Sequence, residues 1–214
     1  GGFTMEAAED VCAFGDVEAW DVLDLLLQFV DKSLVVVEES LTGPRYRMLE
    51  TLREYGLERV YENGDTDEAR CLHAAYYGKF VTAQEADFQG LRQLDAFDMV
   101  EEEMDNIRQA LSWSIGTDPA VALQLAADLG WYWNQRGHWV EALHWQAECQ
   151  QRCRGARSRA MAWMLARKSF MHSQYADGDT ATREAEEARE IASEQNDDRC
   201  IAWCEISLAF AQVH

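Results

Sequence analysis

Six cysteines are the residues of this sequence whose side chains could most readily bind a metal or form a covalent bond. Cys149 and Cys153 are four residues apart, as are Cys200 and Cys204, and His144 precedes the first pair by five residues. Two thiols one helical turn apart share a helix face, which suits metal ligation better than a disulfide framework. The alternative is that they are small apolar side chains packed inside a reduced protein. Because zinc-type spacings and a clear second pair of ligands are missing, we favour packing and predict no metal site.

Motifs of catalysis are missing from the sequence. It has no Gly-x-x-x-x-Gly-Lys-Ser/Thr phosphate loop, no Gly-x-Ser-x-Gly elbow and no His-Glu-x-x-His zinc helix. The carboxylate clusters Glu101-Glu102-Glu103 and Glu186-Glu187 fall on expected helices, where a solvated face is the simplest explanation. We therefore predict no catalytic residue, no cofactor bound by this chain and no enzymatic activity.

A dense group of aromatic residues is the main candidate for binding. It comprises Trp131, Tyr132, Trp133, Trp139 and Trp145. Core packing accounts for part of such a group, but aromatic residues all round a helix predict that some face a partner or a groove. His138, at the adjoining turn, suits capping or packing better than catalysis. We predict a groove for a protein or small effector near Trp131, Trp133, Trp139 and His138.

Charge and hydropathy exclude several partners. The chain has 39 acidic and 19 basic residues, a net charge of −20, and residues 1–66 hold 15 acidic against five basic residues. This field opposes direct nucleic-acid binding and docking on anionic lipid. There is neither a stretch of about 18 apolar residues nor a signal peptide, so we expect a cytoplasmic location without membrane contact. The first residue is not Met and the last residues fall within an amphipathic run, so we expect both ends to continue in a longer polypeptide.

The first 66 residues combine helices with a hairpin. Thr4 should cap a short helix, and a second helix should run from about Val17 to Lys32. The buried stripe of this second helix is expected to hold Trp20, Leu23, Leu27 and Val30. Two strands are expected over residues 34–39 and 45–49, joined by the turn Thr42-Gly43-Pro44, before a helix over residues 50–61 that ends at Asn63-Gly64-Asp65. This order predicts a partial winged helix over residues 1–66.

The remainder is expected to be entirely helical. Residues 67–117 should form a connecting region of two helices, one striped by Leu94, Phe97, Val100, Met104, Ile107 and Leu111, with stops at Gly90 and Gly116. Asp118-Pro119 should open the next helix by capping. Ala162-Trp163 recurs as Ala202-Trp203, Phe170 as Phe210, and the turn Gly137-His138 as Gly178-Asp179. A period near 40 residues predicts a stack of tetratricopeptide-like (TPR) hairpins over residues 118–214, whose last helix exposes a face.

Five segments resemble one bacterial family. They are Gly-Gly-Phe-Thr-Met-Glu-Ala-Ala-Glu (1–9), Leu-Leu-Gln-Phe-Val-Asp-Lys-Ser-Leu-Val (26–35), Arg-Tyr-Arg-Met-Leu-Glu-Thr-Leu-Arg-Glu-Tyr (45–55), Glu-Met-Asp-Asn-Ile-Arg-Gln-Ala-Leu (103–111) and Trp-Tyr-Trp-Asn-Gln-Arg-Gly-His (131–138). They are similar to the large ATP-binding regulators of the signal-transduction NTPase (STAND) class, including AfsR-like and LuxR-type "predicted ATPases". The resemblance implies a mainly α fold, with residues 1–64 as the tail of an ATPase module and residues 67–214 as a sensor region. It also implies an upstream nucleotide-binding domain that takes ATP or ADP, and effector domains at the ends of the parent protein.

One motif of that class can be compared position by position. Met48-Leu49-Glu50 resembles the Met-His-Asp motif of related plant and animal NTPases, whose His contacts the ADP phosphate. Leu49 stands in place of the His and cannot donate a hydrogen bond to phosphate. Met48, Leu49, Glu50 and Arg53 are therefore candidates for a nucleotide-sensing or interdomain contact. The alternative is an ordinary strand-to-helix junction with a surface ion pair.

Two functions from different classes fit these features. The first is a non-enzymatic sensor segment of an ATP-dependent transcriptional or signalling regulator, which binds an effector and couples it to the nucleotide domain. The second is a free-standing TPR adaptor that assembles protein partners and has no phosphate loop in its parent gene.

Overall fold

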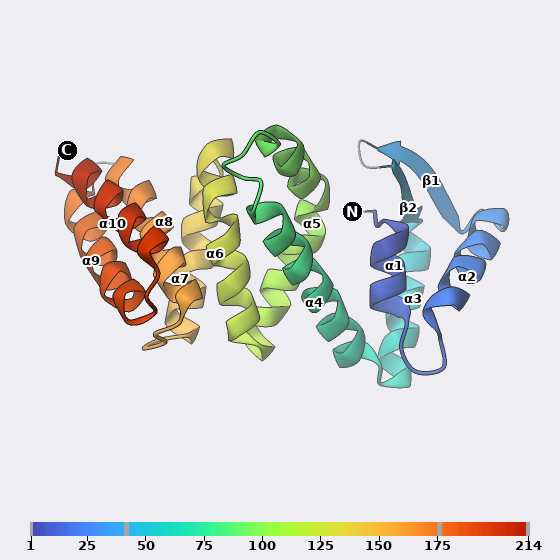
Figure 1. The fold of residues 1–214 in the computed structure, drawn as a ribbon. Helices are drawn as coiled ribbons and strands as arrows, with labels where there is room; N and C mark the ends of the chain where they lie inside the picture. The colour runs from blue at the N-terminus through green and yellow to red at the C-terminus, as the bar shows by residue number, and fades with distance from the viewer. Residues whose placement is uncertain (1, 41–42, 175–176, 213–214) are drawn as a thin grey trace.

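The computed structural model describes residues 2–40, 43–174 and 177–212, and within them the fold is mainly α, as the sequence predicted (Figure 1). A single two-stranded hairpin interrupts the helices of this described part. The elements are α1 (Met5–Cys12), α2 (Ala19–Asp31), β1 (Val35–Ser40), β2 (Gly43–Met48), α3 (Glu50–Asn63), α4 (Thr66–Glu85), α5 (Gln93–Thr117), α6 (Pro119–Arg136), α7 (Trp139–Arg152), α8 (Arg159–Gln174), α9 (Gly178–Glu194) and α10 (Asp198–Ala211).

We call α1, α2, β1, β2 and α3, which lie at one end of the molecule (Figure 1), the N-terminal unit. Within it α1 contacts α2 and β2, and α2 contacts β1, whereas α3 contacts α4. Thr4 caps α1 as predicted, since its Oγ1 accepts a hydrogen bond from the Ala7 amide at 3.1 Å. The strands β1 and β2 pair in antiparallel register, and Phe3 adds a further bridge to Tyr46. The predicted hairpin is confirmed, whereas Thr42 of its predicted turn lies outside the described residues.

The buried stripe predicted for α2 is wrong. Trp20 is 72% exposed, and Leu23 and Leu27 are exposed as well, while Val22 and Leu26 are buried. The helix is apolar around most of its circumference, so periodicity alone does not identify the face that packs. Contacts with α1 and β1 decide it and leave an apolar surface on α2.

The remaining helices form a row of hairpins, α4/α5, α6/α7 and α8/α9, followed by α10 (Figure 1). Along this row α4 contacts α6, α6 contacts α8, and α8 contacts α10. One hydrophobic core extends from Ala74 on α4 to Cys204 on α10. The α4/α5 hairpin, which the sequence assigned to a connecting region, thus shares its core with the later helices.

Local signals place the ends of several helices. Asp118 accepts a hydrogen bond from the Val121 amide at 3.4 Å, with Pro119 as the first residue of α6. Gly137 ends α6 in the left-handed conformation, with a φ of 75°. Phe170 on α8 and Phe210 on α10, which recur 40 residues apart in the sequence, are in ring contact at 5.4 Å between centroids.

Two other predictions for the helical region are wrong in detail. Gly178 is the first residue of α9, capped by Asp177, and is not a counterpart of the left-handed turn at Gly137. Leu94 is 69% exposed although it was assigned to the buried stripe, because α5 has only just begun at Gln93 and this turn projects beyond the core.

Candidate interdomain site

A buried ion pair joins the N-terminal unit to the first hairpin of the stack. The guanidinium of Arg45, on β2, pairs with the carboxylate of Glu103, on α5. Both side chains are withdrawn from water, and Glu103 is only 4% exposed as a residue. An ion pair at such depth is costly to break from one side only, because the remaining charge stays buried without its partner. This buried ion pair therefore holds β2 of the N-terminal unit against α5.

Further hydrogen bonds complete this interdomain joint, which we define as Gly2, Arg45, Tyr77, Glu103 and Asn106. The phenol of Tyr77 and the amide of Asn106 both donate to Oε2 of Glu103, at 3.1 and 2.7 Å. Arg45 and Asn106 also donate to the carbonyl oxygen of Gly2, each at 2.9 Å. The chain before α1, the hairpin, α4 and α5 all meet in one polar network.

Burial and the adjacent carboxylate set the protonation states within the joint. Burial, followed by the charge of Glu103, raises the pKa of Tyr77 well above its ordinary value of 10.0. Burial alone would lower the pKa of Arg45, but its hydrogen bond and charge interaction with Glu103 raise that pKa on balance. Tyr77 thus remains a donor and Arg45 a cation across the physiological range.

The solvated face predicted for Glu101-Glu102-Glu103 is wrong for Glu103. This residue lies between Val100 and Ile107 on the apolar stripe of α5, and both of these neighbours are fully buried. A spacing of three and four residues from buried positions is the signal that identifies it. Glu101 accepts a hydrogen bond from the phenol of Tyr132, and Glu102 accepts one from the hydroxyl of Ser40. The predicted solvated face holds for Glu186 and Glu187, which are exposed on α9.

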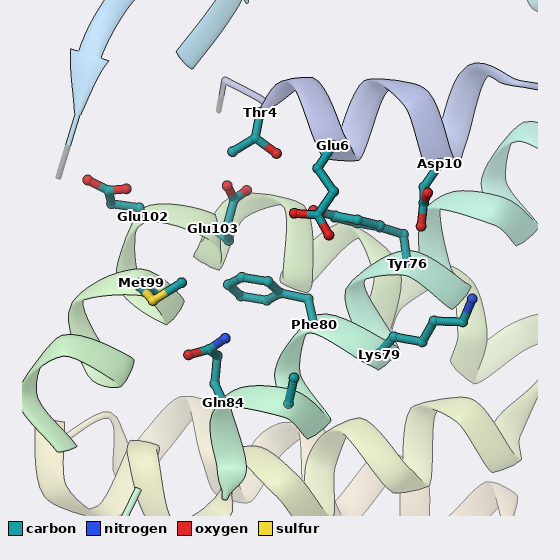
Figure 2. A pocket seen from close by; sticks show the side chains of 11 residues that line it. Thr4, Glu6, Asp10, Tyr76, Lys79, Phe80, Gln84, Met99, Glu102 and Glu103 are labelled. Atoms are coloured by element: carbon teal, nitrogen blue, oxygen red, sulfur yellow. The ribbon is translucent and has the colours of Figure 1, made fainter. Parts of the chain in front are cut away.

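A cavity of about 430 Å³ lies next to the joint, between α1, α4 and α5 (Figure 2). Tyr76, Phe80 and Met99 supply apolar surface to it. Burial raises the pKa of Tyr76, whose phenol also interacts with Thr4 of the N-terminal unit. The complete lining is Thr4, Glu6, Asp10, Tyr76, Lys79, Phe80, Ala83, Gln84, Met99, Glu102 and Glu103. No local pattern in the sequence predicts this cavity, because α1 lies about 70 to 100 residues from the other segments that line it.

The candidate sensor residues at the end of β2 lie at a strand-to-helix junction. Met48 pairs with Val35 as the last residue of β2, and Leu49 precedes α3 and is 50% exposed. The Nε of Arg53 donates to Oε2 of Glu50 at 3.0 Å, and this hydrogen bond lowers the pKa of Glu50. The pair spans one turn at the surface of α3. A role for these residues in nucleotide sensing stays a prediction.

The residues predicted to form an aromatic groove lie in different environments. Trp133 is fully buried, so the prediction that it faces a ligand is wrong; it belongs to the core that α6 shares with its neighbours. Trp131 is half-buried, and its Nε1 donates to the Phe88 carbonyl at 2.9 Å. Trp139 donates to the Asn134 carbonyl at 2.9 Å. The ring of His138 stacks on Tyr132 at 5.9 Å between centroids. Each aromatic group therefore has a packing role, and an effector groove beside them stays a prediction.

A second cavity, of about 160 Å³, lies between α4, α6, α8 and α10 and was also missed. Arg167 is buried at this cavity. Its Nη1 donates to the Ala127 carbonyl at 2.6 Å and its Nη2 to Glu85 at 2.5 Å. Gly130 makes room for the side chain, since a Cβ there would lie 2.7 Å from Cδ of Arg167. Arg167 thereby ties three helices of the stack together, and a glycine inside a helix was the available signal.

The cysteines lie mainly in packed positions. Cys149, Cys200 and Cys204 are buried, and burial raises the pKa of the Cys149 thiol to about 12. Cys153 donates to the Pro119 carbonyl at 3.2 Å. Over the part of the chain that the structure describes, no three His, Cys, Asp or Glu side chains gather in a way that would hold a metal ion. None of the helices searched there is both long and apolar enough to span a bilayer.

Comparison with known proteins finds relatives that are named as transcriptional regulators. It is 38% identical over 150 residues, or 68% of its length, to "Putative HTH-type transcriptional regulator Rv0890c" of Mycobacterium tuberculosis (strain ATCC 25618 / H37Rv). The same identity and coverage apply to "Putative HTH-type transcriptional regulator Mb0914c" of Mycobacterium bovis (strain ATCC BAA-935 / AF2122/97). "Uncharacterized protein Rv0894" of M. tuberculosis is 38% identical over 68 residues.

The aligned region is a small part of these relatives. It spans 16% of the length of the two HTH-type proteins and 17% of the uncharacterized one. The similarity is therefore to one segment of these longer proteins. No family model and no solved structure matches the chain.

Proposed function

We propose that this chain is a non-enzymatic coupling segment of a larger HTH-type transcriptional regulator. The stack of α4 to α10 receives an effector or protein partner, and the N-terminal unit passes the resulting change to the domain that precedes it. The observation that carries the proposal is the joint, in which Arg45 and Glu103 bind two units through a buried charge pair. The similarity to HTH-type proteins over 68% of the chain supports the regulatory context.

The preceding domain in this scheme is a nucleotide-binding domain that uses ATP or ADP. The exposed apolar surface of the N-terminal unit supports such a neighbour. It includes Trp20, Leu23 and Leu27 on α2 and Tyr55, Leu57 and Tyr61 on α3. Exposed apolar surface of this kind is typical of sites where another protein surface docks. We assign DNA binding to another part of the regulator, because the net charge of −20 opposes contact with phosphates, and we place the regulator in the cytoplasm.

Transcript analysis with matched variants tests this function. Arg45→Gln breaks the joint, while Arg53→Gln removes only a surface partner of Glu50. Both are introduced into the gene of the complete regulator, and transcript levels are compared with those of a deletion strain. We expect Arg45→Gln to shift the regulated transcripts and Arg53→Gln to leave them at the parental level. Parental transcript levels in the Arg45→Gln strain, with normal protein abundance, would contradict the coupling function, as would the absence of any transcript change on deletion.

A further inference from the structure

The second cavity, between α4, α6, α8 and α10, is lined mainly by charged and polar side chains. Its lining consists of Thr82 and Glu85 on α4, Gln124 and Asp128 on α6, Arg159, Ala160, Trp163 and Arg167 on α8, and Arg199 on α10. The volume of about 160 Å³ is below the about 300–1,000 Å³ of sites for drug-sized ligands, so only a smaller molecule fits.

Two ion pairs at this cavity neutralise four of the charges in and beside it. Arg167 pairs with Glu85 at 2.5 Å, and Arg159 pairs with Asp197 at 2.6 Å. Asp197 also accepts a hydrogen bond from the Trp163 indole at 2.9 Å. These groups hold the surrounding helices together and leave no net charge among themselves.

Asp128 and Arg199 are the two charges of the lining that remain. Among the residues that the structure describes, neither forms an ion pair. The carboxylate of Asp128 accepts hydrogen bonds from two neutral groups, the hydroxyl of Thr82 at 2.6 Å and the side-chain amide of Gln124 at 2.8 Å. The exposed guanidinium of Arg199 lies over the ring of Trp163, 5.3 Å from its centroid. One anion on α6 and one cation on α10 thus border the same cavity without neutralising each other.

Both of these groups have unused capacity for hydrogen bonds. Burial raises the pKa of Asp128, and the nearby charge of Glu85 opposes that of Arg167, so the ionised carboxyl lacks full compensation. A carboxylate with two donors has further lone pairs to offer, and a guanidinium has several N–H donors. The Nε of Arg167 is also buried without a hydrogen-bond partner among the described residues. Groups that are left unsatisfied beside a cavity indicate a site for a polar molecule.

We propose that this cavity binds a small zwitterion, a molecule with an ammonium group and a carboxylate a few bonds apart, such as a free amino acid. The ammonium group donates to the carboxylate of Asp128, and the ligand carboxylate accepts from the guanidinium of Arg199. Such charge-assisted hydrogen bonds are stronger than neutral ones. An amine alone would leave Arg199 without an anion, and an acid alone would leave Asp128 without a cation. The zwitterion supplies both and joins α6 to α10 across α8.

One helix connects this cavity with the joint. Thr82 and Glu85 follow Tyr77 of the joint on α4 by five and eight residues. A ligand that draws α6 and α10 together changes the packing on α4, and Tyr77 carries that change to Glu103. This inference rests on the proposed function, for which it names the class of effector.

Three ligands with one carbon skeleton and different charge test the recognition. The zwitterion is 4-aminobutanoate, whereas butylamine carries the ammonium group alone and butanoate the carboxylate alone. Each is titrated into the 214-residue chain by calorimetry and ligand-observed NMR. Glycine, alanine, serine and β-alanine, each with its matching amine and acid, vary the distance between the two groups. We expect at least one amino acid to bind, with an affinity about tenfold or more above those of its amine and its acid.

Charge-removing variants locate the site and assign each contact. Asp128→Asn and Arg199→Gln should each weaken binding of the amino acid by about tenfold or more. In Asp128→Asn the amino acid should lose its advantage over the acid, and in Arg199→Gln its advantage over the amine, which a merely structural defect would not produce. The controls Asp24→Asn on α2 and Arg183→Gln on α9 remove exposed charges of the same kinds and should leave the affinity unchanged.

Circular dichroism of each variant checks that it is folded. Failure of every amino acid in the series to bind at millimolar concentration would overturn the proposal, and so would an equal loss of affinity in the control variants. Equal binding of the acid would also overturn it in favour of a simple anion site, and equal binding of the amine in favour of a cation site.

Hydrogen exchange separates this inference from the function on which it rests. If the amino acid binds and changes amide protection in α4 and in the β1–β2 hairpin, both are supported. If it binds at Asp128 and Arg199 without any change in the hairpin, the ligand class stands and the coupling function fails. If no amino acid binds while Arg45→Gln still alters the regulated transcripts, the coupling function stands and the zwitterion site is wrong.

Discussion

The guanidinium of Arg45 on β2 is paired with the carboxylate of Glu103 on α5, across 58 residues of chain and at a depth that excludes most water. Charges removed from water in this way depend on each other, since neither has solvent to replace its partner. Arg45 and Asn106 also both donate to the Gly2 carbonyl, so that the first residues of the chain are held at the same point.

Breaking the pair from one side should destabilise the protein strongly. Arg45→Met leaves Glu103 buried without its cation, and we expect the free energy of unfolding to fall by about 3 kcal/mol in urea titrations. The double variant Arg45→Met/Glu103→Met should recover most of this loss, because it removes both buried charges. Arg53→Met, at an exposed pair, is the control and should show no measurable change. Equal midpoints for Arg45→Met and Arg53→Met would refute the claim that the joint is a stabilising contact.

Gly130 should resist a substitution that usually stabilises helices. Alanine in place of an exposed helical glycine is favourable by up to about 1 kcal/mol. At position 130, however, the new Cβ would lie 2.7 Å from Cδ and 2.9 Å from Cβ of Arg167. Gly130→Ala should therefore lower the free energy of unfolding by about 1–3 kcal/mol as Arg167 is displaced. Gly56→Ala on α3, where no atom lies within 4 Å, should stabilise instead. The same sign for both substitutions would contradict the close packing of Arg167 against α6.

The buried thiol of Cys149 predicts a loss of stability in alkali. Burial raises its pKa from 9.0 to about 12 in the folded chain. Below pH 9 the thiol is protonated in both states, so its full contribution is present. Between about pH 9 and 12 the unfolded chain loses the proton more readily, and linkage then favours unfolding. Urea titrations at pH 8 and pH 10 should show a smaller decline for Cys149→Ala than for the parental chain, whereas identical declines would exclude this contribution.

The pair of Arg108 on α5 and Glu141 on α7 predicts the opposite dependence in acid. The hydrogen bond from Arg108, with Nε to Oε1 at 2.7 Å, lowers the pKa of Glu141 from 4.5. A lowered folded pKa gives stability that is present above pH 4.5 and is lost as the pH falls through the folded value. Since Arg108 is partly exposed, the contribution should stay below about 1 kcal/mol. Melting temperatures of Glu141→Gln and the parental chain should differ at pH 7, and the difference should shrink as the pH is lowered below 4.5; a constant difference would indicate a packing effect.

Local sequence signals were sufficient for much of the fold. Thr4, Asp118 and Gly137 mark helix ends because a cap or a left-handed residue acts within one turn. The β-branched run at Val35–Val37 predicted β1 for a similarly local reason. The recurrence of Phe170 at Phe210 predicted neighbouring helices in the stack, because equivalent residues of a repeat occupy equivalent positions.

Features that depend on distant segments were not predictable in this way. Periodicity on α2 does not show whether the Trp20 face or the Val22 face is buried, because the contacts with α1 and β1 decide which face packs. Glu103 was assigned to solvent because its partner, Arg45, is far away in sequence. Trp133 was assigned to a groove because a sequence does not show which side of a helix its neighbours cover. The cavity of Figure 2 was missed for the same reason, as three separate helices enclose it.

Native-state hydrogen exchange followed by mass spectrometry tests the central claim, that the joint couples the stack to the N-terminal unit, most directly. Glu103→Gln changes α5 only, so exchange in α1, β1 and β2 reports transmission across the joint. We predict faster exchange in all three elements, whereas Leu129→Ala, a cavity-forming control in the core of α6, should accelerate exchange in the stack alone. Unchanged protection of α1 and the hairpin in Glu103→Gln, with faster exchange confined to α4 and α5, would contradict coupling between the two units.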